Sequence, residues 1–139
     1  MDEIEITTRE SPSPEERGAI IGGLVGYNDA QASPEHHREL TVLSYRAGEL
    51  VGGLLGFTHW NWVFIKQLWV AEAVRGCGIG QRLIRAAEQE GVTRGCGHAH
   101  CDTFGFQALP FYQKLGYEIF GRLDDYPPGH ARYFLQKRL

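Results

Sequence analysis

A chain of 139 residues, 42% of them hydrophobic and 22% charged, is large enough for one domain, residues 1–139, with a single hydrophobic core. The net charge of −3, without a basic run, argues against a nucleic-acid partner, and no apolar stretch reaches the roughly 18–20 residues that a membrane span needs. The first ten residues are acidic and lack the features of a signal peptide, so we expect a cytoplasmic protein. An odd number of cysteines without CxxC spacing is typical of reduced thiols: Cys77, Cys96 and Cys101.

The N-terminal region predicts a strand and then a helix. Ile4, Ile6 and Thr8 alternate with polar residues, which favours a short strand over residues 4–8. Ser13 followed by Pro14 and two glutamates predicts a helix start with Ser13 as N-cap. The helix is expected to bury a stripe made of Ile20, Leu24 and Tyr27, and its glycines predict fraying or a break: Gly22, Gly23 and Gly26.

The next part of the chain predicts an antiparallel meander. Residues 40–45 and 50–58 are β-prone and are joined by a turn-like segment, residues 46–49, which indicates a hairpin. Three glycines in the second strand indicate a bulge or a close backbone approach: Gly52, Gly53 and Gly56. The apolar run over residues 62–71 predicts the central strand.

The second half of the chain predicts two helices and three further strands. The first helix is expected over residues 78–90, with Gly91 as its stop. Its periodicity places Ile79, Leu83, Ala86 and Ala87 inward and Arg82, Arg85, Glu88 and Gln89 outward. A strand, a helix closed by Gly116, and two more strands are expected over residues 98–103, 107–115, 117–121 and 132–137. The predicted fold class is α+β with a mixed sheet of six or seven strands.

The segment Arg75-Gly76-Cys77-Gly78-Ile79-Gly80 lies between the central strand and the longer helix. Alternate glycines allow a tight turn whose backbone N–H groups are accessible, and the helix N-terminus points its partial positive charge to the same place. The turn therefore predicts an anion site, which we call the cradle. Its spacing lacks the GxGxxG of dinucleotide folds and the Gly-Lys-Ser/Thr of a P-loop.

A second motif, Phe111-Tyr112-Gln113-Lys114-Leu115-Gly116-Tyr117, follows about 30 residues after the cradle. Together with the strand Leu68-Trp69-Val70, the two motifs closely resemble the GNAT superfamily of N-acetyltransferases, most strongly from Leu68 to Tyr117. The resemblance implies a mostly antiparallel mixed sheet flanked by about four helices. It also implies an acetyl-CoA-dependent enzyme that transfers an acetyl group to a primary amine by direct attack in a ternary complex.

The resemblance further implies where acetyl-CoA, the cosubstrate, binds. In this superfamily the backbone of the strand before the turn, here at Leu68 and Val70, hydrogen-bonds the pantetheine arm. The pyrophosphate is held by backbone of the turn, while the Ile79 side chain belongs to the core. The expected pyrophosphate contacts are Arg75, Gly76, Cys77, Gly78, Ile79, Gly80 and Gln81.

Catalytic roles are implied for a few side chains. Tyr112 stands where family members often have a tyrosine that protonates the departing thiolate, although a buried core tyrosine is the alternative. The asparagine that commonly opens the second motif is replaced here by Gly105 or Phe106. Because the central strand carries no glutamate, the candidate bases are His59, Asp102 and, less favoured, Glu72, and water is an alternative. The aromatic side chains Trp60 and Trp62 are candidate walls of the acceptor cleft.

Two further interpretations are weighed against these. Period-two alternation places Cys96, His98, His100 and Asp102 on one face of a strand, a pattern compatible with a metal, but the fold needs a strand there and no metal is expected. A catalytically weak CoA-binding sensor or interaction module, and an O-acyl or longer-acyl transferase, are the alternative functions. The acceptor is not identified by the sequence. Homodimers are common in the superfamily, and the apolar C-terminal strands are a candidate pairing surface.

Overall fold

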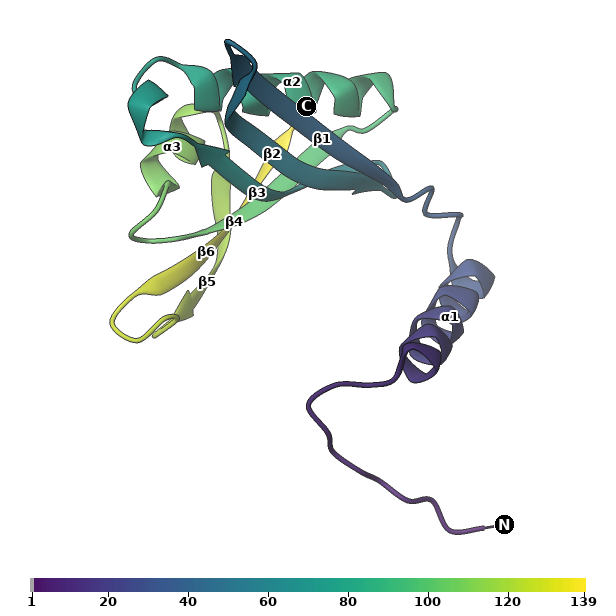
Figure 1. Cartoon of the computed structure of the whole chain (residues 1–139). Coiled ribbons are helices and arrows are strands. Elements are labelled where there is room, and N and C mark those ends of the chain that lie inside the picture. Colours follow the sequence, from purple (N-terminus) through teal and green to yellow (C-terminus); the bar gives the residue numbers. More distant parts are fainter. Residues whose placement is uncertain (1) are drawn as a thin grey trace. The chain divides into compact units, whose positions relative to one another are not determined.

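The computed structural model describes residues 2–139, which form two compact units that divide between Glu35 and His36. The first unit contains one helix, α1 (Pro14–Gln31) (Figure 1). Ser13 caps it as predicted: the Ser13 hydroxyl accepts a hydrogen bond from the Glu16 backbone N–H at 3.1 Å, and the Glu16 carboxylate accepts one from the Ser13 N–H at 2.8 Å. This reciprocal pair satisfies two backbone donors that the first turn leaves open.

Three expectations for the first unit are wrong. Residues 4–8 form no strand, because no neighbouring strand pairs with them among the described residues. α1 runs unbroken for 18 residues despite its glycines, and none of its residues is buried, including the predicted stripe of Ile20, Leu24 and Tyr27. The capping box supports the start of the helix, which has no packing partner inside its own unit.

The second unit is built on a six-stranded sheet in the order β1-β2-β3-β4-β6-β5 (Figure 1). Every neighbouring pair is antiparallel except β3 and β4, which are parallel. This confirms the predicted α+β class, the meander and the central strand. The strands are β1 (Arg38–Arg46), β2 (Glu49–His59), β3 (Trp62–Val70), β4 (His98–Phe104), β5 (Glu118–Asp124) and β6 (Ala131–Arg138).

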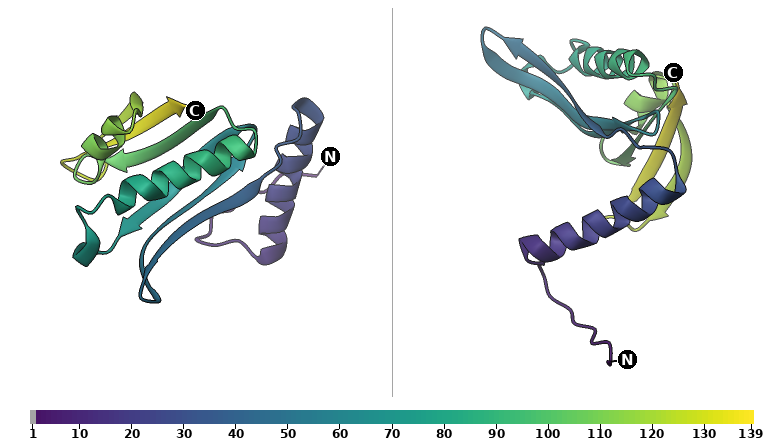
Figure 2. Two further views of the ribbon diagram at one scale, coloured as in Figure 1. Left: turned by 90° about the horizontal axis from the view of Figure 1, so that it is seen from above. Right: turned by 90° about the vertical axis from the view of Figure 1, so that its right-hand side faces the viewer.

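Two α-helices and a 3-10 turn complete the second unit, so residues 2–139 contain three α-helices where about four were expected. They are η1 (Glu72–Val74), α2 (Ile79–Thr93) and α3 (Leu109–Lys114). α2 lies along one face of β1, β2 and β3 (Figure 2). Its side chains Leu83, Ile84 and Ala87 are buried against the sheet and form much of the core. Within the described residues, no helix has both the length and the apolar character needed to cross a membrane.

The face of α2 differs from the prediction at two positions. Ala86, expected inward, is exposed, while Glu88, expected outward, is buried. The Glu88 carboxylate accepts hydrogen bonds from the Tyr117 hydroxyl at 2.9 Å and from the Lys137 ammonium at 2.8 Å. Burial is acceptable for this charge because partners from outside the helix satisfy it.

Gly91 does not stop α2, which continues to Thr93. A Cβ at Gly91 would lie 2.3 Å from the Val63 Cγ2 atom, so the glycine allows close packing of α2 on β3. The left-handed residue that follows the helix is Gly95, with φ of 86°. By contrast, Gly116 adopts the predicted left-handed conformation directly after α3, with φ of 94°.

Candidate functional site

The sheet opens between its two parallel strands. β3 and β4 are paired only from Trp62–His98 to Ile65–Cys101, although β3 continues to Val70 and β4 to Phe104. Beyond that point each strand stays paired on its other side, β3 with β2 and β4 with β6. The two halves of the sheet therefore separate into a V.

A bulge between β2 and β3, in which Lys66 of β3 is the extra residue, marks the place where the separation starts. The register between β2 and β3 shifts between Leu55 and Gly56, as the glycines of this strand predicted. A Cβ at Gly56 would lie 2.1 Å from the Phe64 carbonyl oxygen, so only glycine allows this approach. The bulge leaves Lys66 without a register partner on β2 and turns the end of β3 away from β4.

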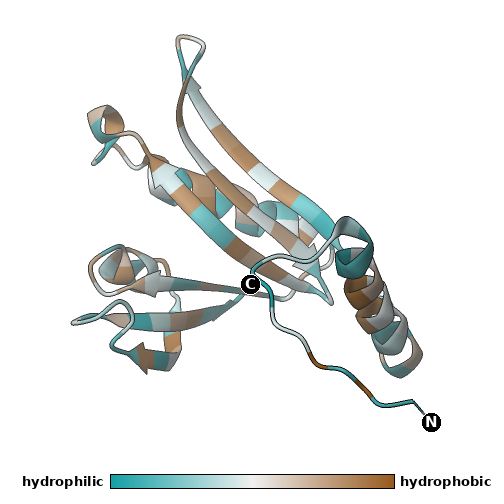
Figure 3. Cartoon of the chain, turned by 60° about the horizontal axis from the view of Figure 1, so that its bottom comes forward, coloured by the Kyte–Doolittle hydropathy of each residue, from teal (hydrophilic) through white to brown (hydrophobic). Residues whose placement is uncertain are grey.

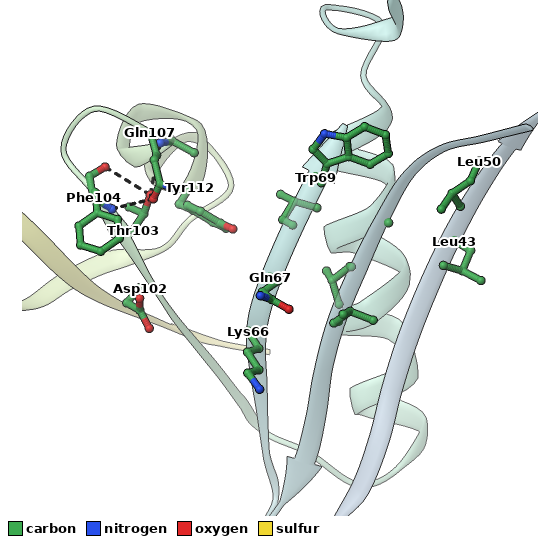
Figure 4. Close-up of a pocket in the computed structure, with 15 residues that line it drawn as sticks. Leu43, Leu50, Lys66, Gln67, Trp69, Asp102, Thr103, Phe104, Gln107 and Tyr112 are labelled. Carbon is green, nitrogen blue, oxygen red and sulfur yellow. Dashed lines mark hydrogen bonds between the residues drawn. The ribbon is translucent and has the colours of Figure 1, made fainter. Parts of the chain in front are cut away.

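A cleft of about 720 Å³ occupies the V (Figure 4). Its walls come from β1, β2 and β3 on one side and from β4 and α3 on the other. The lining residues are Leu43, Leu50, Gly53, Leu54, Leu55, Lys66, Gln67, Leu68, Trp69, Asp102, Thr103, Phe104, Gln107, Ala108 and Tyr112. The lining includes three predicted site residues, Leu68, Asp102 and Tyr112.

The cradle follows directly after β3. Gly76 and Gly78 have φ of 77° and 80°, in the left-handed region of backbone conformation that residues with a side chain rarely adopt. Gly78 is the N-cap of α2 and has no side chain to accept hydrogen bonds from the first turn, which leaves these N–H groups for a ligand. The Arg75 Nε donates to the Val70 carbonyl at 3.0 Å and ties the turn to the strand. The geometry fits the anion site predicted from the sequence.

The third glycine of the cradle has a packing role. A Cβ at Gly80 would lie 3.2 Å from the Phe111 ring, so the start of α2 approaches α3 closely. Phe111 precedes Tyr112 in α3, and their rings are in contact at 5.3 Å between centroids. The cradle and Tyr112 are thus held together through one aromatic side chain.

Tyr112 extends from α3 toward the gap between β4 and β3 (Figure 4). The residue is 5% exposed, and its ring packs edge-on against Tyr117 at 5.7 Å. Burial, with smaller effects from Cys101 and Asp102, raises the pKa of Tyr112 above its ordinary value. The phenol therefore stays protonated at neutral pH and is available as a proton donor.

The loop between β4 and α3 is fixed by two side chains that sequence reasoning missed. The Gln107 side-chain oxygen accepts a hydrogen bond from the Phe104 N–H at 3.0 Å. The Thr103 hydroxyl accepts one from the Ala108 N–H at 3.3 Å, just before α3 starts. The available signal was the polar residues beside a helix start, which are typical of local capping.

Asp102 lies on the β4 wall and forms an ion pair with Arg132 of β6. The Arg132 Nε and Nη2 atoms donate to the same oxygen, Oδ1, at 2.9 and 2.7 Å. Hydrogen bonding to Asp102 raises the pKa of Arg132. The guanidinium also lies 5.1–5.6 Å from the ring centres of Phe104, Tyr126 and Phe134. Arg132, another residue missed from the sequence, therefore holds Asp102 in a fixed orientation.

His59 lies at the end of β2 and is not among the residues that line the cleft. Its ring contacts Phe57 at 4.9 Å and Trp60 at 5.2 Å. Its role as a base remains a prediction, as does the less favoured role of Glu72, which lies in η1.

The strand face that suggested a metal has other partners. His98 stacks on Trp62 at 4.5 Å, and His100 stacks on Phe64 at 4.7 Å. Burial, with a smaller electrostatic effect of His59, lowers the pKa of His100. Within residues 2–139, no group of three or more His, Cys, Asp or Glu side chains is arranged to hold a metal ion.

A sheet that opens between two parallel strands, with an anion cradle at one end of the gap and a buried phenol beside it, defines an acyl-transferase type of site. The comparison with known families agrees with this class: the model of the Acetyltransferase (GNAT) family matches residues 5–117. The chain belongs to this family and is an acetyltransferase of the GNAT kind.

Named relatives support the same assignment. Over 93 residues the chain is 43% identical to the blasticidin-S acetyltransferase of Streptomyces morookaense, covering 66% of this chain and 68% of that protein. It is 36% identical over 121 residues to acetyltransferase Atu2258 of Agrobacterium fabrum, with coverage of 86% and 88%. A solved acetyltransferase from Bacillus cereus superposes with a TM-score of 0.87 at 31% identity, covering 96% of this chain and 98% of that one.

Proposed function

We propose that the protein transfers the acetyl group of acetyl-CoA to a primary amine within a ternary complex. The observation that carries this proposal is the opening between β3 and β4, because its cleft has Tyr112 in the wall and the cradle follows directly after the end of β3. The helix N-terminus and left-handed glycines suit a pyrophosphate. Beyond Ile65 the β4-facing edge of β3, including Leu68 and Val70, has lost its parallel partner and suits an extended pantetheine arm. Relatives of the same fold support the donor, since one solved structure is a streptothricin acetyltransferase of Bacillus anthracis in complex with acetyl coenzyme A, at 20% identity and a TM-score of 0.66.

The side chains suit a direct transfer. When bound, acetyl-CoA supplies a thioester whose carbonyl carbon accepts the amine nitrogen, so that a C–N bond forms and the C–S bond breaks. Tyr112 donates its proton to the departing sulfur, which matches its buried, protonated phenol. Of the three predicted bases, Asp102 lines the cleft, whereas His59 and Glu72 do not. We assign the carboxylate of Asp102 to holding the amine, whose proton leaves through water.

Blasticidin S is the first acceptor to test, because the most identical of the named relatives carries that activity. Purified protein is incubated with acetyl-CoA and blasticidin S or a panel of primary amines, and free thiol is measured together with the mass of the product. Release of CoA with a product heavier by one acetyl group supports the proposal. Binding of CoA without thiol release from any amine rejects it in favour of a sensor, and a hydroxyl-linked or longer-acyl product identifies the other alternative.

A further inference from the structure

The wall of the cleft formed by β1, β2 and β3 is an apolar surface on the side of the sheet opposite α2. Four of its side chains are each about half exposed, although all are large and hydrophobic. We call this surface the shelf; it consists of Leu43, Leu50, Leu55 and Trp69. Figure 3 shows apolar segments recurring along these strands. A contiguous patch of exposed apolar side chains often marks a binding site, because soluble proteins rarely leave such a patch in contact with water.

A glycine shapes the middle of the shelf. Gly53 is the register partner of both Leu43 on β1 and Trp69 on β3. A Cβ at Gly53 would lie 3.4 Å from the Leu43 Cδ2 atom, so the leucine packs beside the glycine and no side chain of β2 stands between the leucine and the indole. The shelf therefore offers a shallow apolar seat beside a large aromatic surface, which suits a compact ring or hydrocarbon group.

The opposite wall offers one fixed carboxylate. Both Arg132 bonds to Asp102 end on Oδ1, so Oδ2 takes no part in the ion pair. Arg132 is itself held by three aromatic rings, one of which, Phe104, lines the same cleft. Asp102 thus presents an oxygen of defined orientation on the same cleft wall as Tyr112.

The charges in the cleft disfavour a polycation. Among the described lining residues, Asp102 is the single acid and Lys66 the single base. Arg132 adds a second positive charge directly behind Asp102. One ammonium group finds a partner there, but further positive charges on the same molecule meet Lys66 and Arg132 instead.

From the shelf, the fixed carboxylate and this charge balance, we propose that the acceptor is a primary monoamine with an uncharged apolar body. The amine nitrogen lies at Asp102 Oδ2, and the apolar body lies on the shelf against Trp69. This inference rests on the proposed acetyl transfer and adds the chemical class of the acceptor. Asp102 then contacts the substrate, while Arg132 is a positioning residue.

Three amines separate the contributions of the shelf and of the charge. 2-Phenylethylamine carries an apolar ring, ethylamine is the same amine without the ring, and spermidine is a polycation. We expect kcat/KM for 2-phenylethylamine to exceed that for ethylamine and that for spermidine by about tenfold or more, in line with burial of one aromatic group. The measurement is thiol release at saturating acetyl-CoA and one pH.

Variants then assign the preference to residues. Trp69→Leu is expected to reduce the ratio of kcat/KM for 2-phenylethylamine to kcat/KM for ethylamine several-fold. Phe120→Leu is the matched control, because Phe120 is similarly exposed on β5 and does not line the cleft. CoA affinity, measured by calorimetry, stays constant in both variants.

The carboxylate is tested in the same way. Asp102→Asn is expected to raise KM for both monoamines about tenfold or more, because a charge-assisted hydrogen bond is lost. Asp124→Asn is the control: Asp124 accepts a bond from Arg122 Nε at 2.6 Å in an exposed ion pair outside the cleft. Arg132→Met should raise KM for the monoamines, and Arg132→Lys, which keeps the positive charge, should raise it less. If Arg132 had a purely structural role, both variants would lose stability equally and would show the same KM.

The outcomes distinguish the inference from the function on which it rests. If spermidine or blasticidin S, which carries a guanidinium and a carboxylate beside its amine, is acetylated as well as 2-phenylethylamine, or if the ring gives no advantage over ethylamine, the inferred class is wrong while acetyl transfer stands. An unchanged KM in Asp102→Asn removes Asp102 from acceptor binding. If no amine at all is acetylated, the proposed function fails and the inference fails with it.

Discussion

The cradle and the acceptor half of the cleft are formed by different atoms. The cradle consists of backbone N–H groups from one short segment. The φ angles of Gly76 and Gly78 shape this segment, and the Arg75 side chain ties it to the preceding strand, β3. The acceptor half consists of side chains from separate strands, above all Trp69 of β3 and the pair of Asp102 on β4 with Arg132 on β6. A backbone site tolerates changes that keep its φ angles, whereas a site made of side chains is altered by each replacement. Changes in either half should therefore affect different kinetic constants.

Gly78→Glu is expected to have the largest effect, on the cradle alone. The change places a side chain at φ of 80° and a negative charge where an anion is proposed to bind. We expect CoA affinity, measured by calorimetry, to fall more than about a hundredfold, since both strain and charge repulsion oppose binding.

Gly48→Glu is the matched control for this variant. Gly48 has φ of 78° in the β1–β2 hairpin turn and, like Gly78, has no atom within 4 Å of a built Cβ. It carries the same strain and charge outside the cradle, so CoA affinity should stay within a few-fold of the original. Equal loss in both variants would show that strain, rather than the cradle, explains the effect.

Tyr112→Phe acts where the two halves meet. We expect kcat to fall about a hundredfold or more with nearly constant CoA affinity, because a general acid is removed without a change of shape. Since the pKa of Tyr112 is raised by burial, this group should cause no loss of activity as the pH rises to about 10. Tyr117→Phe, one ring away, should lower stability through its lost bond to Glu88 and leave kcat unchanged. Equal kcat in Tyr112→Phe and the original protein excludes the phenol as the acid.

The fold was largely predictable wherever the signal was local. Alternating and continuous apolar runs placed all six strands of the second unit, and Ser13 and Gly116 marked helix ends through their own side chain or φ angle. The prediction was wrong where a residue's environment is set by atoms that are distant in the sequence. Glu88 has the spacing of an outward residue, but Tyr117 and Lys137 from later segments make its burial favourable. Gly91 resembles a helix stop, but a glycine is needed at this position because Val63 of β3 packs closely against it.

The candidate site also has one part that local sequence predicts and one part that depends on contacts between distant segments. The cradle lies in a single contiguous motif, so its residues and backbone role were accessible from the sequence. Arg132 is thirty residues from Asp102, and only the pairing of β4 with β6 brings the two together. The shelf was equally hidden, because Leu43, Gly53 and Trp69 become neighbours through strand register. Trp60 and Trp62 were the expected aromatic wall, whereas Trp69 is the tryptophan that lines the cleft.

Glu88→Ala tests the frame that both halves share, since α2 begins at the cradle and packs on β3. The change leaves the Tyr117 hydroxyl and the Lys137 ammonium without their carboxylate, so we expect a loss of about 3 kcal/mol in unfolding free energy. Urea unfolding followed by tryptophan fluorescence measures it, because all three tryptophans lie in or beside β3. Glu88→Leu combined with Lys137→Met should recover most of the loss, and no recovery would indicate that the helix face, rather than the unpaired charge, is responsible.

Gly91→Ala perturbs the same helix at its far end and is expected to have the smallest effect. The added Cβ would lie 2.3 Å from Val63 Cγ2, so α2 and β3 must move apart slightly, at a cost of about 1–3 kcal/mol. Gly97→Ala, where a Cβ meets no atom within 4 Å and φ is not left-handed, should change the unfolding free energy by less than about 0.5 kcal/mol. Because the cradle lies four turns away along α2, CoA affinity should change little in either variant. A large loss of CoA affinity in Gly91→Ala would instead show that the packing of α2 on β3 sets the position of the cradle.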